Sequence, residues 1–314
     1  MLKRLRYWLE WFFVKTFAGF IPLLPLALLR QLARFAGAVV YRLDRKGRAV
    51  ALANLEAVFG DALDQSARER IACESLQAFA RAFLELFWAP RLNKNNVRDY
   101  VSFEDTTRFS ELITEPAIMV TCHFGNFEWA NLLFGLEGYT GTILTQRFKN
   151  DRLTSIFREV RELSGNIAIT QENSILRLFK ALWKGRPIGM LTDLTLKMDD
   201  PAVIIDAFGR KMRVTLAHCI LHERTGIPIV PFIALPRSDG GYSVKIMPPL
   251  SFPAGSTHQQ IAQTCWNQFE PLIRQHPEQW MWVYKHWRYR PSFTDHEYPF
   301  YANRSARFDE ELGK

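Results

Sequence analysis

The chain has 314 residues, 48% of them apolar, which is enough for a full core and excludes a disordered chain. Its four cysteines form no CxxC pair, which favours reduced thiols over a disulfide framework. The net charge of +8 lies entirely in residues 1–48, where ten basic residues face two acidic ones. Because the remainder is neutral, no nucleic-acid partner is expected, and anionic lipid headgroups best explain the concentrated charge.

The N-terminal region has the composition of an interfacial helix. Residues 7–15 are aromatic and basic, and residues 16–29 are uncharged and interrupted by Pro22 and Pro25. A helix over that uncharged stretch covers about 21 Å, which is less than the roughly 30 Å of a hydrocarbon core. Basic residues flank it on both sides, whereas a span concentrates them on one side. We therefore expect residues 1–30 to form a membrane-anchoring helix in the cytoplasmic leaflet, with a short tilted span as the alternative.

The rest of the chain predicts helices followed by an α/β domain. Residues 31–93 form a helical lead-in, with helices over 31–59 and 66–88. Strands are expected at 101–103, 118–121, 142–145, 167–169, 188–191 and 229–233, and helices at 126–136, 152–163, 175–183 and 215–224. This alternation over residues 94–291 predicts a largely parallel sheet with helices on both faces. Residues 242–247 read as a late antiparallel strand, and residues 292–314 as a C-terminal tail.

His123 and Glu128 stand where a buried strand passes into a helix. Gly125 and Asn126 between them supply a turn and an N-cap, and open α/β folds place ligands at such crossovers. The turn can bring Glu128 back to one ring nitrogen of His123 and leave the other free as a base. A capped helix beside a buried histidine is the alternative. Cys122 points to the opposite face of an alternating strand, which disfavours it as a nucleophile.

Further polar residues follow other predicted strands. Arg147, with Asn150 close behind, suits a phosphate or carboxylate ligand, or is simply solvated. Asp193 at the end of another strand either positions a substrate or caps a turn. Gly209 and Lys211 offer a second anion contact, although such basic runs are usually solvated loops.

Two further patterns resemble binding motifs. His218 and His222 have metal-ligand spacing but no evident third ligand, so no metal is expected. Residues 280–291 interleave aromatic and basic side chains, as RNA-binding surfaces do. The neutral charge of the chain beyond residue 48 instead favours a membrane-side or acyl-chain surface.

Taken together, residues 1–291 resemble the glycerolipid/lysophospholipid acyltransferase superfamily, and most closely its bacterial lipid A late (lauroyl/myristoyl) acyltransferases. The matching blocks are His123 with Glu128, Gly141 to Arg147 with Asn150, Phe208-Gly209, residues 226–232, and residues 277–283 followed by Arg288 and Arg290-Pro291. The third block lacks the Pro-Glu-Gly of glycerol-phosphate acyltransferases, and residues 194–197 lack the aromatic residues expected of lipid A enzymes. The identity of the acceptor lipid therefore stays open.

The resemblance implies an O-acyltransferase on the cytoplasmic side of the bacterial inner membrane. It would move a fatty acyl chain from acyl-carrier protein or acyl-CoA to a hydroxyl of a lipid A precursor or related glycolipid. No cofactor beyond the acyl donor is implied. His123 and Glu128 would form the base dyad, and the substrate-binding residues would be Asn126, Arg147, Asn150, Asp193, Gly209 and Lys211. The alternatives are a lysophospholipid or mannoside-type glycolipid acyltransferase, a non-catalytic membrane lipid-binding protein and, third, a metal hydrolase.

Overall fold

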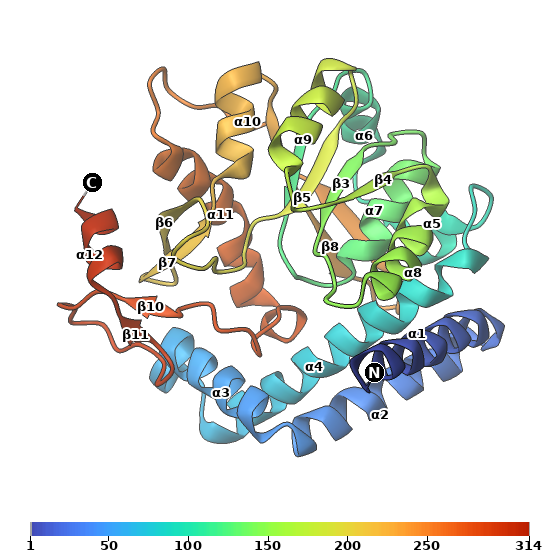
Figure 1. Cartoon of the computed structure of the whole chain (residues 1–314), viewed down its shortest axis with the longest axis horizontal. Helices are drawn as coiled ribbons and strands as arrows, with labels where there is room; N and C mark the ends of the chain where they lie inside the picture. The colour runs from blue at the N-terminus through green and yellow to red at the C-terminus, as the bar shows by residue number, and fades with distance from the viewer. Residues whose placement is uncertain (1, 314) are drawn as a thin grey trace.

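The computed structural model describes residues 2–313, and its N-terminal helices lie beneath a sheet-containing body (Figure 1). The helices are α1 (Leu2–Phe20), α2 (Leu26–Leu43), α3 (Arg45–Phe59), α4 (Gln65–Trp88), α5 (Val97–Tyr100), α6 (Thr106–Leu112), α7 (Phe127–Leu136), α8 (Asp151–Arg161), α9 (Ser174–Trp183), α10 (Ala217–Thr225), α11 (His258–Gln275) and α12 (Ala306–Leu312). The strands are β1 (Val101–Phe103), β2 (Ile118–Thr121), β3 (Thr142–Thr145), β4 (Ile167–Thr170), β5 (Ile188–Leu191), β6 (Ala202–Ala207), β7 (Arg210–Thr215), β8 (Ile229–Pro236), β9 (Tyr242–Ile246), β10 (Tyr289–Arg290) and β11 (Asn303–Arg304).

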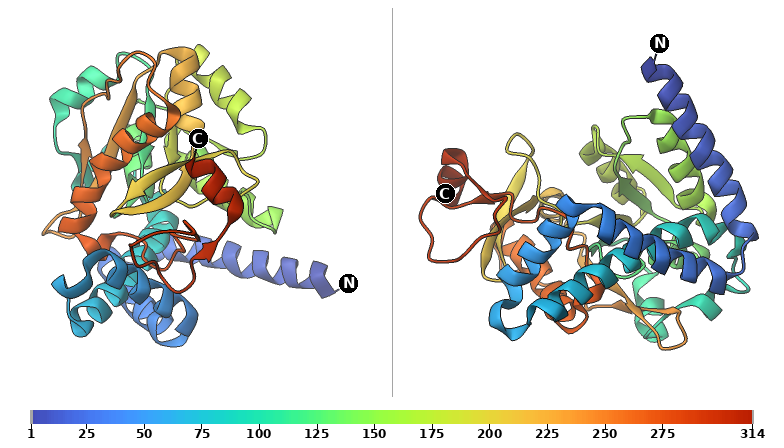
Figure 2. Two further views of the ribbon diagram at one scale, coloured as in Figure 1. Left: turned by 90° about the vertical axis from the view of Figure 1, so that its left-hand side faces the viewer. Right: turned by 90° about the horizontal axis from the view of Figure 1, so that it is seen from below.

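The N-terminal region forms three helices, which are separated near Pro22 and Pro25 and again at Asp44. A short 3₁₀ turn (Ile21–Leu23) separates α1 from α2, so residues 2–30 contain α1 and the start of α2 rather than one helix; Met1 lies outside the described residues. The helix expected over 31–59 is likewise two helices, because the Asp44 side chain accepts the Gly47 N–H and starts α3. The N-terminal end of α1 projects beyond the rest of the molecule in both views of Figure 2. Between residues 2 and 313, no helix is both long and apolar enough to cross a membrane.

The main sheet has seven strands in the order β1-β9-β8-β2-β5-β3-β4. The five strands from β8 to β4 are mutually parallel, while β9 pairs with β8 in the antiparallel sense and β1 runs parallel to β9. The predictions of a largely parallel sheet and of a late antiparallel strand are thus confirmed.

Helices cover both faces of this sheet, and the side chains of β2 accordingly alternate between two cores. Ile118 and Val120 belong to a core with residues of α9, α10 and α11, whereas Met119 belongs to a second core with residues of α7 and α8. All three side chains are buried, as expected for a central parallel strand that is covered on both sides.

The C-terminal third contains elements that the sequence reading missed. Residues 202–215 form the antiparallel hairpin β6–β7, with its turn at Phe208 (φ 53°) and Gly209 (φ 77°), where a loop was expected. The long helix α11, which has a Thr257–Gln260 capping box, was also missed.

The prediction of an aromatic lipid-facing surface at residues 280–291 is wrong for its tryptophans. Trp280, Trp282 and Trp287 are fully buried and pack around Phe208. Their interleaving with basic residues reflects alternation between core and surface rather than a binding face.

Candidate active site

The turn that carries His123 is fixed from outside the sheet. After β2 ends at Thr121, Phe124 forms an isolated bridge with Trp280, and the Gly125 N–H donates to the Gln279 carbonyl at 3.0 Å. Gly125 has a φ of +55°, and a Cβ at this position would lie 2.0 Å from the Ala234 carbonyl oxygen. Only glycine allows both the backbone conformation and this close approach.

His123 contacts a carboxylate that lies just beyond the end of the neighbouring strand β5. Its Nδ1 lies 2.8 Å from Asp193 Oδ1, and its backbone N–H donates to Asp193 Oδ2 at 2.9 Å. Trp280 Nε1 donates to the same Oδ2 at 2.9 Å. Because the carboxylate accepts at Nδ1, the neutral imidazole carries its proton there and presents Nε2 as an acceptor.

Asp193 is fully buried, whereas the His123 side chain keeps 13% of its surface exposed. Burial raises the pKa of the Asp193 carboxyl, but His123 outweighs it through its charge and hydrogen bonds, so that the net pKa lies below the usual value. His286 stacks on Trp280 at 4.0 Å and lies beside the Asp193 carbonyl, and burial lowers its pKa to about 4. The site therefore combines an ionised carboxylate with a neutral, buried imidazole behind it.

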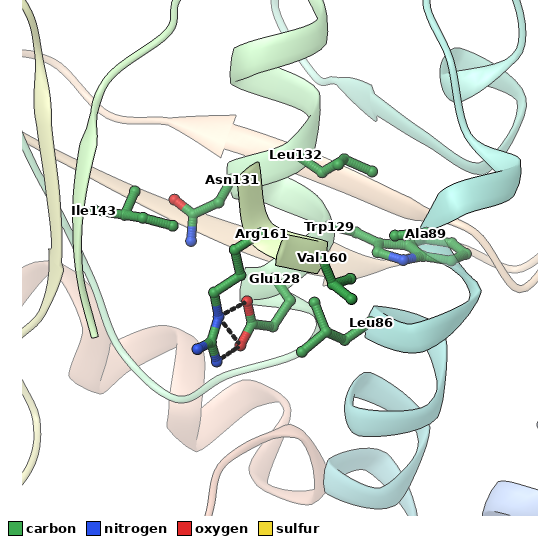
Figure 3. Close-up of a pocket in the computed structure, with 9 residues that line it drawn as sticks. All are labelled: Leu86, Ala89, Glu128, Trp129, Asn131, Leu132, Ile143, Val160 and Arg161. Carbon is green, nitrogen blue, oxygen red and sulfur yellow. Dashed lines mark hydrogen bonds and ion pairs between the residues drawn. The ribbon is translucent and has the colours of Figure 1, made fainter. Parts of the chain in front are cut away.

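Glu128 has a different partner from the one expected. Both of its carboxylate oxygens accept from Arg161 Nε, at 3.2 and 3.0 Å, and Arg161 Nη2 contacts Oε1 at 2.5 Å (Figure 3). The expectation that Glu128 turns back to hold His123 is thus corrected, because Asp193 occupies that place. Burial lowers the pKa of the Arg161 guanidinium, but the charge of Glu128 outweighs it and raises the pKa overall. The pair joins α7 to the end of α8.

A small cavity adjoins this ion pair. Besides Glu128 and Arg161 it is lined by Asn131 and mostly apolar side chains, namely Leu86, Ala89, Trp129, Leu132, Ile143 and Val160 (Figure 3). It encloses about 10 Å³, enough for roughly one water molecule. The cavity in this conformation is therefore far too small for a fatty acyl chain.

The side chains of Asn126, Arg147 and Asn150, which were expected to contact substrate, are engaged with protein partners. Asn126 is fully buried, its Oδ1 accepts the Trp129 N–H at 2.9 Å, and its Nδ2 donates to Glu85. Arg147 is half exposed and pairs with Asp151 and Glu172. Asn150 is buried and donates to α1, at the Tyr7 carbonyl (2.8 Å) and Glu10 (3.1 Å).

Gly209 and Lys211 lie in a separate cleft. This cleft of about 710 Å³ is formed by β6, β7, α11 and residues between Pro291 and Leu312. Lys211 Nζ pairs with Asp206 there, at 2.9 Å. The structure therefore brings His123 and Asp193 together, and none of the hydrogen bonds that it records joins Gly209 or Lys211 to that pair.

Sequence reasoning missed Arg161 and Trp280 as partners of the site. Both lie far along the chain from the groups they contact. Trp280 belongs to the 277–283 block that carries the family resemblance, but nothing in that block indicates its hydrogen bond to Asp193. The pairing of Asp193 with His123 did leave a signal, since each residue stands two positions beyond its strand. Thr121 is opposite Leu191 in the β2–β5 register, so His123 and Asp193 continue that register.

Comparison with known proteins shows the family to which the chain belongs. Residues 1–289 match the family model described as bacterial lipid A biosynthesis acyltransferase. The chain is also similar to the lipid A biosynthesis lauroyltransferase of Escherichia coli (strain K12), with 21% identity over 307 residues that cover 93% of this chain and 95% of the relative. The chain therefore belongs to the bacterial lipid A biosynthesis acyltransferase family, and it is an acyltransferase.

Proposed function

We propose that this protein is a membrane-associated O-acyltransferase that moves a fatty acyl chain from an acyl thioester to a hydroxyl of a lipid A precursor. The contact that carries the proposal is the 2.8 Å hydrogen bond between His123 Nδ1 and Asp193, which leaves Nε2 as a base at the end of β2. Family membership supports acyl transfer, and the name of the Escherichia coli relative supports a lipid A-type acceptor.

In the proposed reaction, His123 Nε2 removes the proton from the acceptor hydroxyl as its oxygen attacks the thioester carbonyl carbon. The new C–O bond forms, the C–S bond breaks, and the imidazolium returns the proton to the departing thiolate. No acyl-enzyme is needed because the alcohol is itself the nucleophile. Asp193 acts as a positioning carboxylate that holds the proton on Nδ1 and stabilises the imidazolium.

Glu128 contributes to this site through Arg161 rather than through the imidazole. Both side chains are largely buried and lie in the first turn of α7 and the last of α8. We propose that the pair sets how the first turn of α7 faces the substrate. Among the described residues, the recorded hydrogen bonds do not use the N–H groups of Phe127 and Glu128 at the start of this helix, and these two groups are suited to the oxyanion of the tetrahedral intermediate.

The N-terminal helices are proposed to hold the enzyme at the cytoplasmic surface of the inner membrane. Phe13 on α1 is 67% exposed and Phe35 on α2 is 70% exposed, and Phe17 and Phe20 on α1 are also exposed. Exposed aromatic and aliphatic side chains beside a basic N-terminal region suit an anionic lipid surface. The acyl donor would be acyl-carrier protein or acyl-CoA, and the acceptor a lipid A precursor or related glycolipid.

The test is an acyl-transfer assay in detergent that offers both donors against lipid A precursors, lysophospholipids and mannoside glycolipids. Wild type should acylate a lipid A precursor, and His123→Ala should lose at least the 10²–10⁴-fold typical of a general base. Transfer only to a lysophospholipid or a mannoside lipid would refute a lipid A precursor as the acceptor, but it would support the proposed acyl-transfer reaction. Lipid binding without thioester consumption by wild type would refute the catalytic proposal. Sedimentation with anionic vesicles, compared between wild type and Phe35→Glu, tests the membrane contact.

A further inference from the structure

A buried carboxylate on α4 lies directly behind the turn that carries His123. Glu85 is fully buried, and its Oε1 accepts from Arg30 on α2 at 3.1 Å and from Arg81, one turn earlier, at 2.8 Å. Its Oε2 accepts from Asn126 Nδ2 at 2.7 Å and from the Tyr242 hydroxyl at 3.0 Å. One carboxylate oxygen therefore binds the two arginines, and the other binds the turn before α7 and the first residue of β9.

The contact with Asn126 links this carboxylate to the catalytic turn. Asn126 is the N-cap of α7, and its Oδ1 accepts the Trp129 N–H at 2.9 Å. Since the amide nitrogen must then face Glu85, the carboxylate fixes the orientation of the cap. The Glu85 carbonyl also accepts from Trp129 Nε1 at 2.8 Å, so Glu85 holds both ends of the first turn of α7. His123 is only three residues before this cap.

The cluster is anchored at several points of the fold. Arg81 packs over the Tyr242 ring at 4.6 Å and donates to the Gly240 carbonyl, while Arg30 comes from the helix that carries the exposed Phe35. A buried carboxylate requires such complete hydrogen bonding, because an unpaired charge in the interior is costly. The Asn126 amide is held in place by these anchors and not by solvent.

We propose that Glu85 is a positioning residue for acyl transfer, which orients Asn126 and through it the turn that presents His123. This inference rests on the proposed function, because its kinetic readout is the transfer reaction. Glu85 touches neither His123 nor any reacting atom, so its effect is expected in kcat rather than in the KM of either substrate.

The first variant is Glu85→Gln, which keeps the shape but replaces one acceptor oxygen by a donor amide. That amide cannot accept from both the arginines and Asn126. We expect a fall in kcat of roughly 10- to 100-fold, as for loss of a hydrogen bond to a charged group, with KM for donor and acceptor within about twofold.

The second variant is Asn126→Asp, and the decisive one is the double variant. Aspartate caps a helix as well as asparagine does, but in the single variant it opposes the Glu85 carboxylate. In Glu85→Gln/Asn126→Asp the amide and the carboxylate exchange places, so the bridge is restored with the same net charge. The double variant should therefore turn over at least tenfold faster than Asn126→Asp alone.

The matched control is Glu137→Gln, which removes a carboxylate paired with Arg98 at the other end of α7. It should leave kcat unchanged. Amide hydrogen exchange over residues 121–130 supplies a readout that does not depend on turnover, and Glu85→Gln should speed exchange there more than Glu137→Gln does.

Two outcomes would overturn the inference. One is a Glu85→Gln enzyme whose kcat per folded molecule and turn exchange match wild type, which would leave Glu85 a purely structural role. The other is a double variant no faster than Asn126→Asp. If wild type itself transfers no acyl group, the proposed function fails, and the exchange measurement still decides whether Glu85 orders the turn.

Discussion

Replacing Asp193 by asparagine should trap His123 in an unreactive tautomer. Two N–H donors, the His123 backbone and Trp280 Nε1, converge on Oδ2 at 2.9 Å each. In Asp193→Asn the amide oxygen must therefore take the Oδ2 position, which turns the amide nitrogen toward His123 Nδ1. Since Nδ1 must then accept, the imidazole proton moves to Nε2 and that atom can no longer act as a base.

The size of the effect follows from the cost of turning the amide back. The reactive tautomer requires the amide NH₂ to face both donors, and each N–H left without an acceptor costs about 1–3 kcal/mol when buried. The two together cost about 2–6 kcal/mol, equivalent to a fall in kcat of roughly 30- to 10⁴-fold. The same change in the serine protease triad costs about 10⁴-fold, so the upper end of the range is reasonable.

The assay is steady-state acyl transfer at saturating donor and acceptor, combined with ¹⁵N NMR of the histidine ring. Wild type should show the proton on Nδ1 and Asp193→Asn should show it on Nε2. Asp105→Asn is the matched control, because Asp105 caps α6 at Thr107 and Arg108, and asparagine caps equally well. A kcat within threefold of wild type, with the proton still on Nδ1, would refute the assignment of Asp193.

Two further predictions concern the stability of the site. Gly125→Ala should lower the free energy of unfolding by more than the roughly 1–2 kcal/mol expected from backbone strain alone, because the new Cβ would clash with the Ala234 carbonyl oxygen. Gly226→Ala is the control: it also has a positive φ, but its Cβ would enter open space, so it should cost only the backbone strain. If urea unfolding showed the same loss of free energy for both variants, the clash at Gly125 would be refuted. Arg161→Met should cost about 3–5 kcal/mol by leaving Glu128 buried without a partner, and adding Glu128→Gln should recover much of this. Simple additivity of the two changes would show that the pair is not coupled.

Much of the fold could be predicted because its signals are local. The buried runs at β2 and β5 and the turn with Asn126 each lie within a few residues, and their periodicity is enough to identify them. The hairpin β6–β7 was not predicted because its basic residues resemble a solvated loop. In the structure, however, Arg213 is buried and pairs with Glu311 on α12. A charge that is neutralised by a residue almost a hundred positions away cannot be recognised from its neighbours.

The same distinction separates what could be predicted of the site from what could not. His123 was identified from its place at a strand end, and Asp193 from a similar place, but not as a pair. Choosing between Asp193 and Glu128 as the partner of the imidazole requires the strand order, because β2 and β5 are neighbours although two other strands lie between them in sequence. Spacing in the sequence favoured Glu128, which is five residues from His123, whereas the order of strands in the sheet favours Asp193.

Residues 279–280, which follow α11, belong to the candidate active site. Trp280 donates to Asp193, and the Gln279 carbonyl accepts from Gly125, so this segment holds both the turn and the carboxylate. Glu85 on α4 holds the same turn from the other side through Asn126. Ordering each backbone residue of a turn costs about 1–2 kcal/mol, and these contacts offset that cost before substrate binds. The groups that hold His123 and its turn therefore come from α4, from the residue pair after β5 and from the segment after α11, which lie far apart in the sequence.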